Sequence, residues 1–201
     1  LPLQLVNNIN PRKKVIAIGS STGGVEALNE IIPLLPAQSP AVLIAQHMPD
    51  KFTASFAARL DRTSSVTVVE ATNGMLIEPG HVYLAPGGSH LRIAKKDGML
   101  VTHVTQDPLV NGHRPSVDVL FESFAKEIPK QSVGVILTGM GKDGAEGLKK
   151  LHDLGALTYG QNQESCLVYG MPRAAKELGG VLKELPLEQI AHYILQSCSQ
   201  T

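Results

Sequence analysis

Residues 15–24 read VIAIGSSTGG, and this stretch decides the fold class. A run of apolar, mostly β-branched residues stops at a turn rich in glycine and hydroxyl groups, and a segment with helical character follows. The pattern predicts a buried strand, a tight turn and the start of a helix. Such a turn can either bind a phosphate or expose a serine nucleophile, and the rest of the chain must decide between these two chemistries.

The same alternation continues along the chain, which predicts an α/β fold. Continuous apolar runs indicate strands buried on both faces of a parallel sheet. We therefore expect a doubly wound, mainly parallel, Rossmann-like sheet flanked by helices, with Ser116 as the N-cap of one helix. Strands are expected at residues 15–19, 41–45, 66–70, 82–85, 133–138, 156–159 and 181–184, and helices at 24–35, 53–61, 117–128, 145–154, 172–178 and 187–197.

One stretch departs from this rhythm. Residues 90–94 and 99–104 flank the sequence KKDG, which predicts an antiparallel β-hairpin around an Asp97-Gly98 turn. We expect this hairpin to add to the edge of the sheet.

Composition excludes several classes of function. The chain has 201 residues, enough for one domain, and its 18 basic and 18 acidic residues cancel. Without a basic face, without Trp and with 4% aromatic residues, nucleic-acid binding is not indicated. No apolar run approaches the ~20 residues that span a bilayer. Cys166 and Cys198 are expected to be ordinary reduced cysteines of a cytoplasmic protein.

The first residues lack periodicity, and the chain begins with Leu1. We expect residues 1–13 to be the remnant of a linker and residues 14–201 to form the functional domain.

Three interpretations compete for the turn at 19–24. A dinucleotide-binding motif, G-x-G-x-x-G, fails because Ser21 stands where the second glycine is required. A P-loop fails because Val25-Glu26 replace the Lys-Ser/Thr pair. A nucleophile elbow, G-x-S-x-G, fits with Ser21 at its centre, whereas Ser20 does not fit that register. A purely structural turn that caps a helix remains the alternative.

A serine nucleophile needs a base at the same edge of the sheet. Because sites in open α/β sheets lie beyond the carboxyl ends of the strands, His47 is the first candidate, directly after the run 41–46. His113, in a loop, is the rival. The other histidines are expected at strand starts on the opposite edge, at a hairpin end or on helices: His81, His90, His103, His152 and His192.

An acid that orients the base can follow the strand 133–138. Asp143 lies there in the glycine-rich sequence GMGKDG, where it could hold an imidazole in one tautomer. Alternatively, Asp143 and Glu146 would form a capping box at a helix start. Backbone amides near Met140 could add an oxyanion donor.

Five motifs then stand in one order: STGG at 21–24, QHMP at 46–49, HRPSVD at 113–118, VILTGMG followed by Asp143-Gly144, and GMPR at 170–173. Together they resemble the catalytic domain of the chemotaxis protein-glutamate methylesterase family over residues 14–197. The resemblance implies Ser21 as nucleophile, His47 as base and Asp143 as orienting acid. Thr22 and Met140 match positions linked to the oxyanion site.

The resemblance also implies the reaction and its setting. Family members hydrolyse γ-glutamyl methyl esters on the cytoplasmic helical bundle of chemoreceptors and release methanol, and many also deamidate receptor glutamines. No metal and no organic cofactor is implied. An N-terminal phosphorylatable receiver domain usually precedes the catalytic domain and is not part of this sequence. A serine hydrolase with another ester or amide substrate, and a non-catalytic or nucleotide-binding α/β module, are the alternatives.

Overall fold

The computed structural model describes residues 8–199. Most of the expected linker, residues 1–7, lies outside the described part. The described chain forms a seven-stranded parallel sheet with the order β3-β4-β2-β1-β7-β8-β9. The strands of this sheet are β1 Val15–Ser20, β2 Val42–Gln46, β3 Thr67–Glu70, β4 His81–Leu84, β7 Ser132–Ile136, β8 Leu157–Gln161 and β9 Lys183–Leu185.

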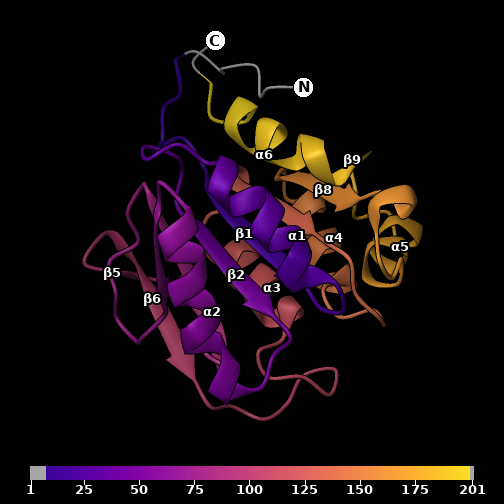
Figure 1. Cartoon of the computed structure of the whole chain (residues 1–201), viewed down its shortest axis with the longest axis horizontal. Coiled ribbons are helices and arrows are strands. Elements are labelled where there is room, and N and C mark those ends of the chain that lie inside the picture. Colours follow the sequence, from indigo (N-terminus) through magenta and orange to yellow (C-terminus); the bar gives the residue numbers. More distant parts are fainter. Residues whose placement is uncertain (1–7, 200–201) are drawn as a thin grey trace.

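Helices cover both faces of the sheet, as expected for a doubly wound fold. In Figure 1, α1, α2 and α6 lie in front of the sheet and α3 and α4 lie behind it. The α-helices are α1 Gly24–Ile31, α2 Asp50–Thr63, α3 Val117–Glu127, α4 Ala145–Asp153, α5 Met171–Glu177 and α6 Leu187–Gln196. Short 3₁₀ turns occur at Ile32–Leu34, Pro129–Gln131 and Gln163–Ser165.

The central strand β1 separates two apolar cores. Ile16 and Ile18 pack with residues of α1, α2 and α6, while Ala17 faces the core formed with α3 and α4. All three side chains are fully buried. A continuous apolar run is therefore the pattern that a strand covered on both sides requires.

The chain reverses its direction of winding at β1. This strand pairs in parallel with β2 on one side and with β7 on the other. The carboxyl ends of these three neighbouring strands therefore meet at a topological switch point, where open α/β sheets form their sites.

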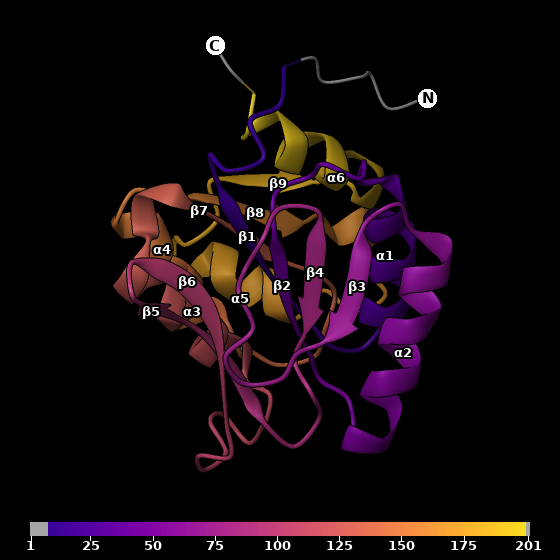
Figure 2. The same ribbon diagram turned by 90° about the vertical axis from the view of Figure 1, so that its left-hand side faces the viewer.

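The hairpin forms, but the expectation that it extends the sheet edge is wrong. β5 (His90–Lys96) and β6 (Met99–Thr105) make a separate two-stranded sheet. Figure 2 shows it lying over α3, where the Ile93 N–H donates to Ser123 Oγ at 3.0 Å. Leu91 and Ile93 enter the core on this side, so burial of apolar surface draws the hairpin over the helix. The Asp97-Gly98 turn has φ angles of 50° and 78°, as its sequence predicts.

Element boundaries otherwise differ by a few residues from those expected. The largest difference is at α1, which ends at Ile31 and is followed by the 3₁₀ turn Ile32–Leu34, whereas α2 begins earlier than expected, at Asp50. Within residues 8–199, no helix combines the length and the apolar character needed to cross a membrane.

Candidate active site

The turn after β1 exposes one of its two serines and buries the other. Ser20 is the last residue of β1 and is completely buried, and its hydroxyl donates to Gln46 Oε1. Ser21 is partly exposed, and its backbone N–H donates to Thr138 O at 3.0 Å. Accessibility therefore favours Ser21 over Ser20 as a nucleophile.

The two glycines of the elbow are required by geometry. Gly23 has a φ of 83°, a left-handed conformation that glycine adopts without strain. A Cβ on Gly19 would lie 2.1 Å from Val117 Cγ1, so only glycine lets the start of α3 approach β1 this closely.

The candidate base follows the neighbouring strand. His47 comes directly after β2, and its backbone N–H donates to Ser20 O at 3.1 Å. The buried carboxamide of Gln46 strengthens this link, because its Nε2 donates to Ser21 O at 2.9 Å and to His47 O at 3.3 Å. Gln46 thus ties the backbone of the serine turn to that of the histidine, a role that sequence reasoning missed.

The His47 ring is paired with the carboxylate of Asp143. The distance from His47 Nε2 to Asp143 Oδ2 is 2.7 Å, with the two side chains only 8% and 2% exposed. Because an ionised carboxylate only accepts, Nε2 carries the proton and Nδ1 holds the lone pair. Nδ1 is buried and has no hydrogen-bond partner within residues 8–199. A base with a free lone pair therefore lies beside the strand that leads into Ser21.

Asp143 is held ionised by an unusual number of donors. Burial alone would raise its pKa, but hydrogen bonds from His47, Asn111, the Val117 N–H and Ser116 hold the pKa at about 2. The donor distances are 2.9 Å for Asn111 Nδ2, 2.8 Å for Val117 N and 2.8 Å for Ser116 Oγ. A carboxylate with such partners stabilises a protonated imidazole.

This environment overturns the expected capping box. The N-cap of α4 is Gly144, without a side-chain cap, and Glu146 is exposed. Asp143 instead accepts from the first backbone N–H groups of α3. Ser116 is the N-cap residue of α3, as expected, but its hydroxyl donates to Asp143 and makes no capping bond. The carboxylate therefore caps a helix distant in sequence, which no local pattern reveals.

The rival base, His113, contacts the first candidate. Its ring is stacked on that of His47, with 3.6 Å between the ring centroids and 7° between the planes. Burial, together with the charge of His47, lowers the pKa of His113, although Asp143 opposes this shift. No hydrogen bond joins His113 to Asp143 within the described residues, so the imidazole–carboxylate pair is formed by His47.

His90 does not lie at the opposite edge, where we expected it. It is buried, its Nε2 is 2.9 Å from Pro108 O, and its Nδ1 accepts the Ser116 N–H at 3.2 Å. The expectation failed because β5 belongs to the separate hairpin, whose direction is independent of the parallel sheet. His90 therefore holds the backbone of Ser116, the residue whose hydroxyl donates to Asp143.

The two softer candidates lie on the turns around Ser21. Thr22 is exposed, and its carbonyl accepts from Thr138 Oγ1 at 2.9 Å. Met140 follows Gly139, where an added Cβ would lie 2.8 Å from Ser21 Cβ. The Met140 side chain is 68% exposed, so it is not a packing residue. Within residues 8–199, the backbone N–H groups of Thr22 and Met140 have no hydrogen-bond partner, which leaves both available to an oxyanion.

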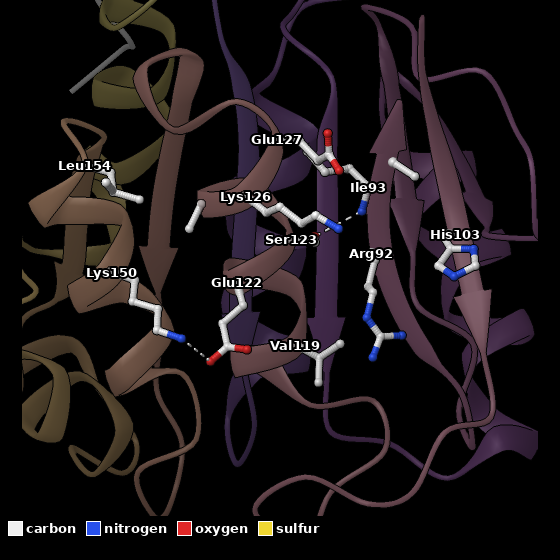
Figure 3. A pocket seen from close by; sticks show the side chains of 12 residues that line it. Arg92, Ile93, His103, Val119, Glu122, Ser123, Lys126, Glu127, Lys150 and Leu154 are labelled. Atoms are coloured by element: carbon white, nitrogen blue, oxygen red, sulfur yellow. Dashed lines mark hydrogen bonds and ion pairs between the residues drawn. The ribbon is translucent and has the colours of Figure 1, made fainter. Parts of the chain in front are cut away.

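The surface beside His47 is a shallow depression of about 300 Å³, lined in part by Met48, Leu109 and His113. A larger groove of about 690 Å³ lies elsewhere, between the hairpin, α3 and α4 (Figure 3). Its charges are mixed, and the Lys150 ammonium pairs with Glu122 at 3.1 Å. None of the three candidate residues Ser21, His47 and Asp143 lines this groove, so cavity volume does not point to the candidate site.

Fold and site together define a class: a parallel α/β domain with a serine elbow and a histidine–carboxylate pair at its switch point. The model of the CheB methylesterase family matches residues 16–194, and the chain belongs to this family. The catalytic domain of CheB methylesterase from Thermotoga maritima has a similar structure, with a TM-score of 0.88 and 39% identity over 91% of this chain and 97% of that chain.

Curated relatives also carry methylesterase names. A protein-glutamate methylesterase/protein-glutamine glutaminase from Caulobacter vibrioides is 54% identical over 94% of this chain, and one from Agrobacterium fabrum is 55% identical over 92%. The matched parts are 55% and 52% of those proteins, so the chain spans about half the length of the curated relatives it matches.

Proposed function

We propose that this chain hydrolyses γ-glutamyl methyl esters on the cytoplasmic helical domain of chemoreceptors, with Ser21, His47 and Asp143 as its triad. The observation that carries the proposal is the His47–Asp143 pair, in which His47 Nδ1 has no hydrogen-bond partner among residues 8–199. His47 follows β2 and Ser21 follows β1, and these two strands pair in parallel. The family membership of the chain points to the same chemistry.

The reaction begins with proton transfer. His47 Nδ1 takes the proton of Ser21 Oγ while that oxygen attacks the ester carbonyl, and Asp143 stabilises the imidazolium. Backbone N–H groups near Thr22 and Met140 would stabilise the tetrahedral oxyanion. The C–O bond to the methoxy group breaks, and the proton on His47 passes to the leaving methanol. An acyl-enzyme between Ser21 and the receptor glutamate results.

The second half repeats these steps with water. His47 removes a proton from water, the hydroxide attacks the acyl carbonyl, and Ser21 leaves with the proton while the glutamate carboxylate is released. With a glutamine substrate the same sequence would release ammonia, so deamidation is part of the proposal.

The site surface suits a substrate displayed on another protein. Three large apolar side chains beside the site are exposed: Leu109 by 60%, Met140 by 68% and Leu167 by 73%. Leu109 lines the depression at His47, and Leu167 contacts the position of Gly23. Exposed apolar residues around a shallow site favour docking of a protein surface over enclosure of a small molecule. A cytoplasmic location and an N-terminal receiver domain as regulatory partner belong to the same proposal.

The test is methanol release from membranes that carry methylated chemoreceptors. Ser21→Ala should abolish release while the fold is retained, because the nucleophile is lost and no core volume is. Ser20→Ala is the matched control, since it removes the neighbouring hydroxyl and should leave most of the rate. Full activity of Ser21→Ala, or an equal loss in Ser20→Ala, would contradict the assignment.

A further inference from the structure

One tight turn contacts both members of the histidine–carboxylate pair. Val110 and His113 exchange two backbone hydrogen bonds, of 3.0 and 2.9 Å, around Asn111 and Gly112. These two central residues have φ angles of 53° and 77°, which is the geometry of a two-residue turn with an Asn-Gly sequence. The turn therefore presents the side chains at 111 and 113 with little conformational freedom.

Each side chain contacts a different partner. The His113 ring lies parallel to the His47 ring at a centroid distance of 3.6 Å. Asn111 Nδ2 donates to Asp143 Oδ1 at 2.9 Å and to Asp118 Oδ2 at 2.6 Å. The turn thus contacts the face of the His47 ring and one oxygen of the Asp143 carboxylate.

We propose that the turn at residues 110–113 positions the pair: His113 fixes the plane of the His47 ring, and Asn111 fixes the Asp143 carboxylate. Both are positioning residues rather than catalytic ones, because they act through His47 and Asp143. The inference rests on the proposed function and extends it by assigning two further residues to the reaction.

The stacking carries a specific consequence for His47. Within residues 8–199 its ring has one hydrogen bond, at Nε2, and a single bond permits the ring to tilt about that contact. A parallel ring in van der Waals contact removes this tilt, so that Nδ1 stays directed at one place. Parallel stacking also points the nitrogens of His113 sideways, so His113 acts on His47 through its ring face and not as a proton donor or acceptor.

Asn111 separates two buried carboxylates. Asp118 and Asp143 are 5% and 2% exposed, and like charges in such a setting repel. One carboxamide has two N–H donors, and here each is directed at one carboxylate. Without Asn111, Asp143 Oδ1 would lose one of its donors, and the repulsion between Asp143 and Asp118 would no longer be offset at that oxygen.

Substitution at 113 separates stacking from acid–base chemistry. His113→Phe keeps a flat ring without ionisable nitrogens, whereas His113→Ala removes the ring. We expect His113→Ala to lower kcat for methanol release on the order of tenfold with KM within about twofold, and His113→Phe to restore kcat to within about threefold of the parent. His103→Ala, on the exposed side of β6, is the matched control. Full activity of His113→Ala, or a His113→Phe as slow as His113→Ala, would overturn the proposal.

Two readouts do not depend on the receptor substrate. Labelling of Ser21 by a fluorophosphonate, in which the serine oxygen displaces fluoride, should slow in His113→Ala and recover in His113→Phe. NMR should show a proton on His47 Nε2 that is protected from exchange in the parent and in His113→Phe, and that exchanges faster in His113→Ala. If the parent releases no methanol, the proposed function fails, while these readouts still decide the positioning role.

Asn111→Gly tests the role of the Asn111 side chain while the backbone conformation of the turn is kept. Glycine tolerates the positive φ and removes both donors. We expect faster exchange of the His47 Nε2 proton and a severalfold lower labelling rate. Asp97→Gly is the matched control, because it makes the same kind of change at a positive φ in the hairpin turn. An unchanged exchange rate in Asn111→Gly would overturn the role of Asn111.

Discussion

At the scale of single residues, the carboxylate of Asp143 contributes both to the proposed chemistry and to folding. It pairs with His47, and it also accepts the Val117 and Asp118 N–H groups at the start of α3. Removing its charge should therefore cost activity and stability together, which is not expected for Ser21.

Asp143→Asn should lower the rate by at least about 10³-fold, because an amide cannot hold the imidazole in the required tautomer. It should also destabilise the protein by about 2 kcal/mol at neutral pH. This is the free energy that corresponds to lowering the pKa of Asp143 from 3.8 to about 2. Since the folded-state pKa lies below the ordinary one, this stability is complete above about pH 4 and is lost as the pH falls toward 2.

Urea unfolding at pH 7, 5 and 3 measures this linkage. The difference in unfolding free energy between the parent and Asp143→Asn should stay constant from pH 7 to 5 and shrink at pH 3. Ser21→Ala should lose activity without a matching loss of stability. A stability difference that is independent of pH would contradict the electrostatic origin.

Sequence patterns identify Ser21 as the candidate nucleophile and His47 as the candidate base because each follows an apolar run that predicts a strand. The contacts of Asn111 and His113 depend on where a remote turn lies in space, so sequence reasoning named His113 only as a rival base and missed Asn111. The dipeptide Asn111-Gly112 was a readable signal for a tight turn, but not for what that turn touches.

At the scale of elements, close packing of α3 on β1 builds the acid side of the site. The absence of a side chain at Gly19 lets Val117 approach, and the N-terminus of the same helix binds Asp143. The G-x-S-x-G motif is thus as much a packing requirement between a strand and a helix as a feature of the turn.

Gly19→Ala should push α3 away from the sheet and reduce both stability and activity, because its Cβ would lie 2.1 Å from Val117 Cγ1. Val117→Ala alone should cost stability through lost packing. The double variant should recover part of the loss of Gly19→Ala, with a coupling free energy of about 1 kcal/mol or more in a thermodynamic cycle. Strict additivity of the two changes would contradict this packing account.

Periodicity predicts each strand of the parallel sheet and each α-helix to within a few residues. The reason is that burial of one or two faces of an element produces a recognisable local pattern of apolar residues. Periodicity misplaced the hairpin, because an antiparallel pair has the same pattern whether it joins a sheet edge or lies over a helix. The contact between Ile93 and Ser123 that settles its position joins residues 30 apart in sequence.

At the scale of the whole molecule, the apolar side chains around the site should govern recognition of the proposed receptor substrate without affecting the proposed chemistry. Leu167→Asp places a charge on the exposed side chain beside the serine turn. It should raise KM for methylated receptor severalfold and leave the fluorophosphonate labelling rate of Ser21 unchanged. Leu154→Asp, at the remote groove of Figure 3, is the control, because Leu154 is also an exposed leucine but lies away from the candidate site. Equal effects of both changes on KM would contradict a docking role for the surface beside the site.

The order of strands at the switch point has a practical corollary. Ser21 and His47 belong to the first part of the chain, Asp143 belongs to the second, and the exposed Asp97-Gly98 turn lies between them. Two separately produced fragments divided at this turn would each lack part of the proposed triad. Pairing of β1 with β7 and of β5 with β6 would reunite them. The fold is thus suited to a split reporter, whose esterase signal would arise only when two fused partners bring the fragments together.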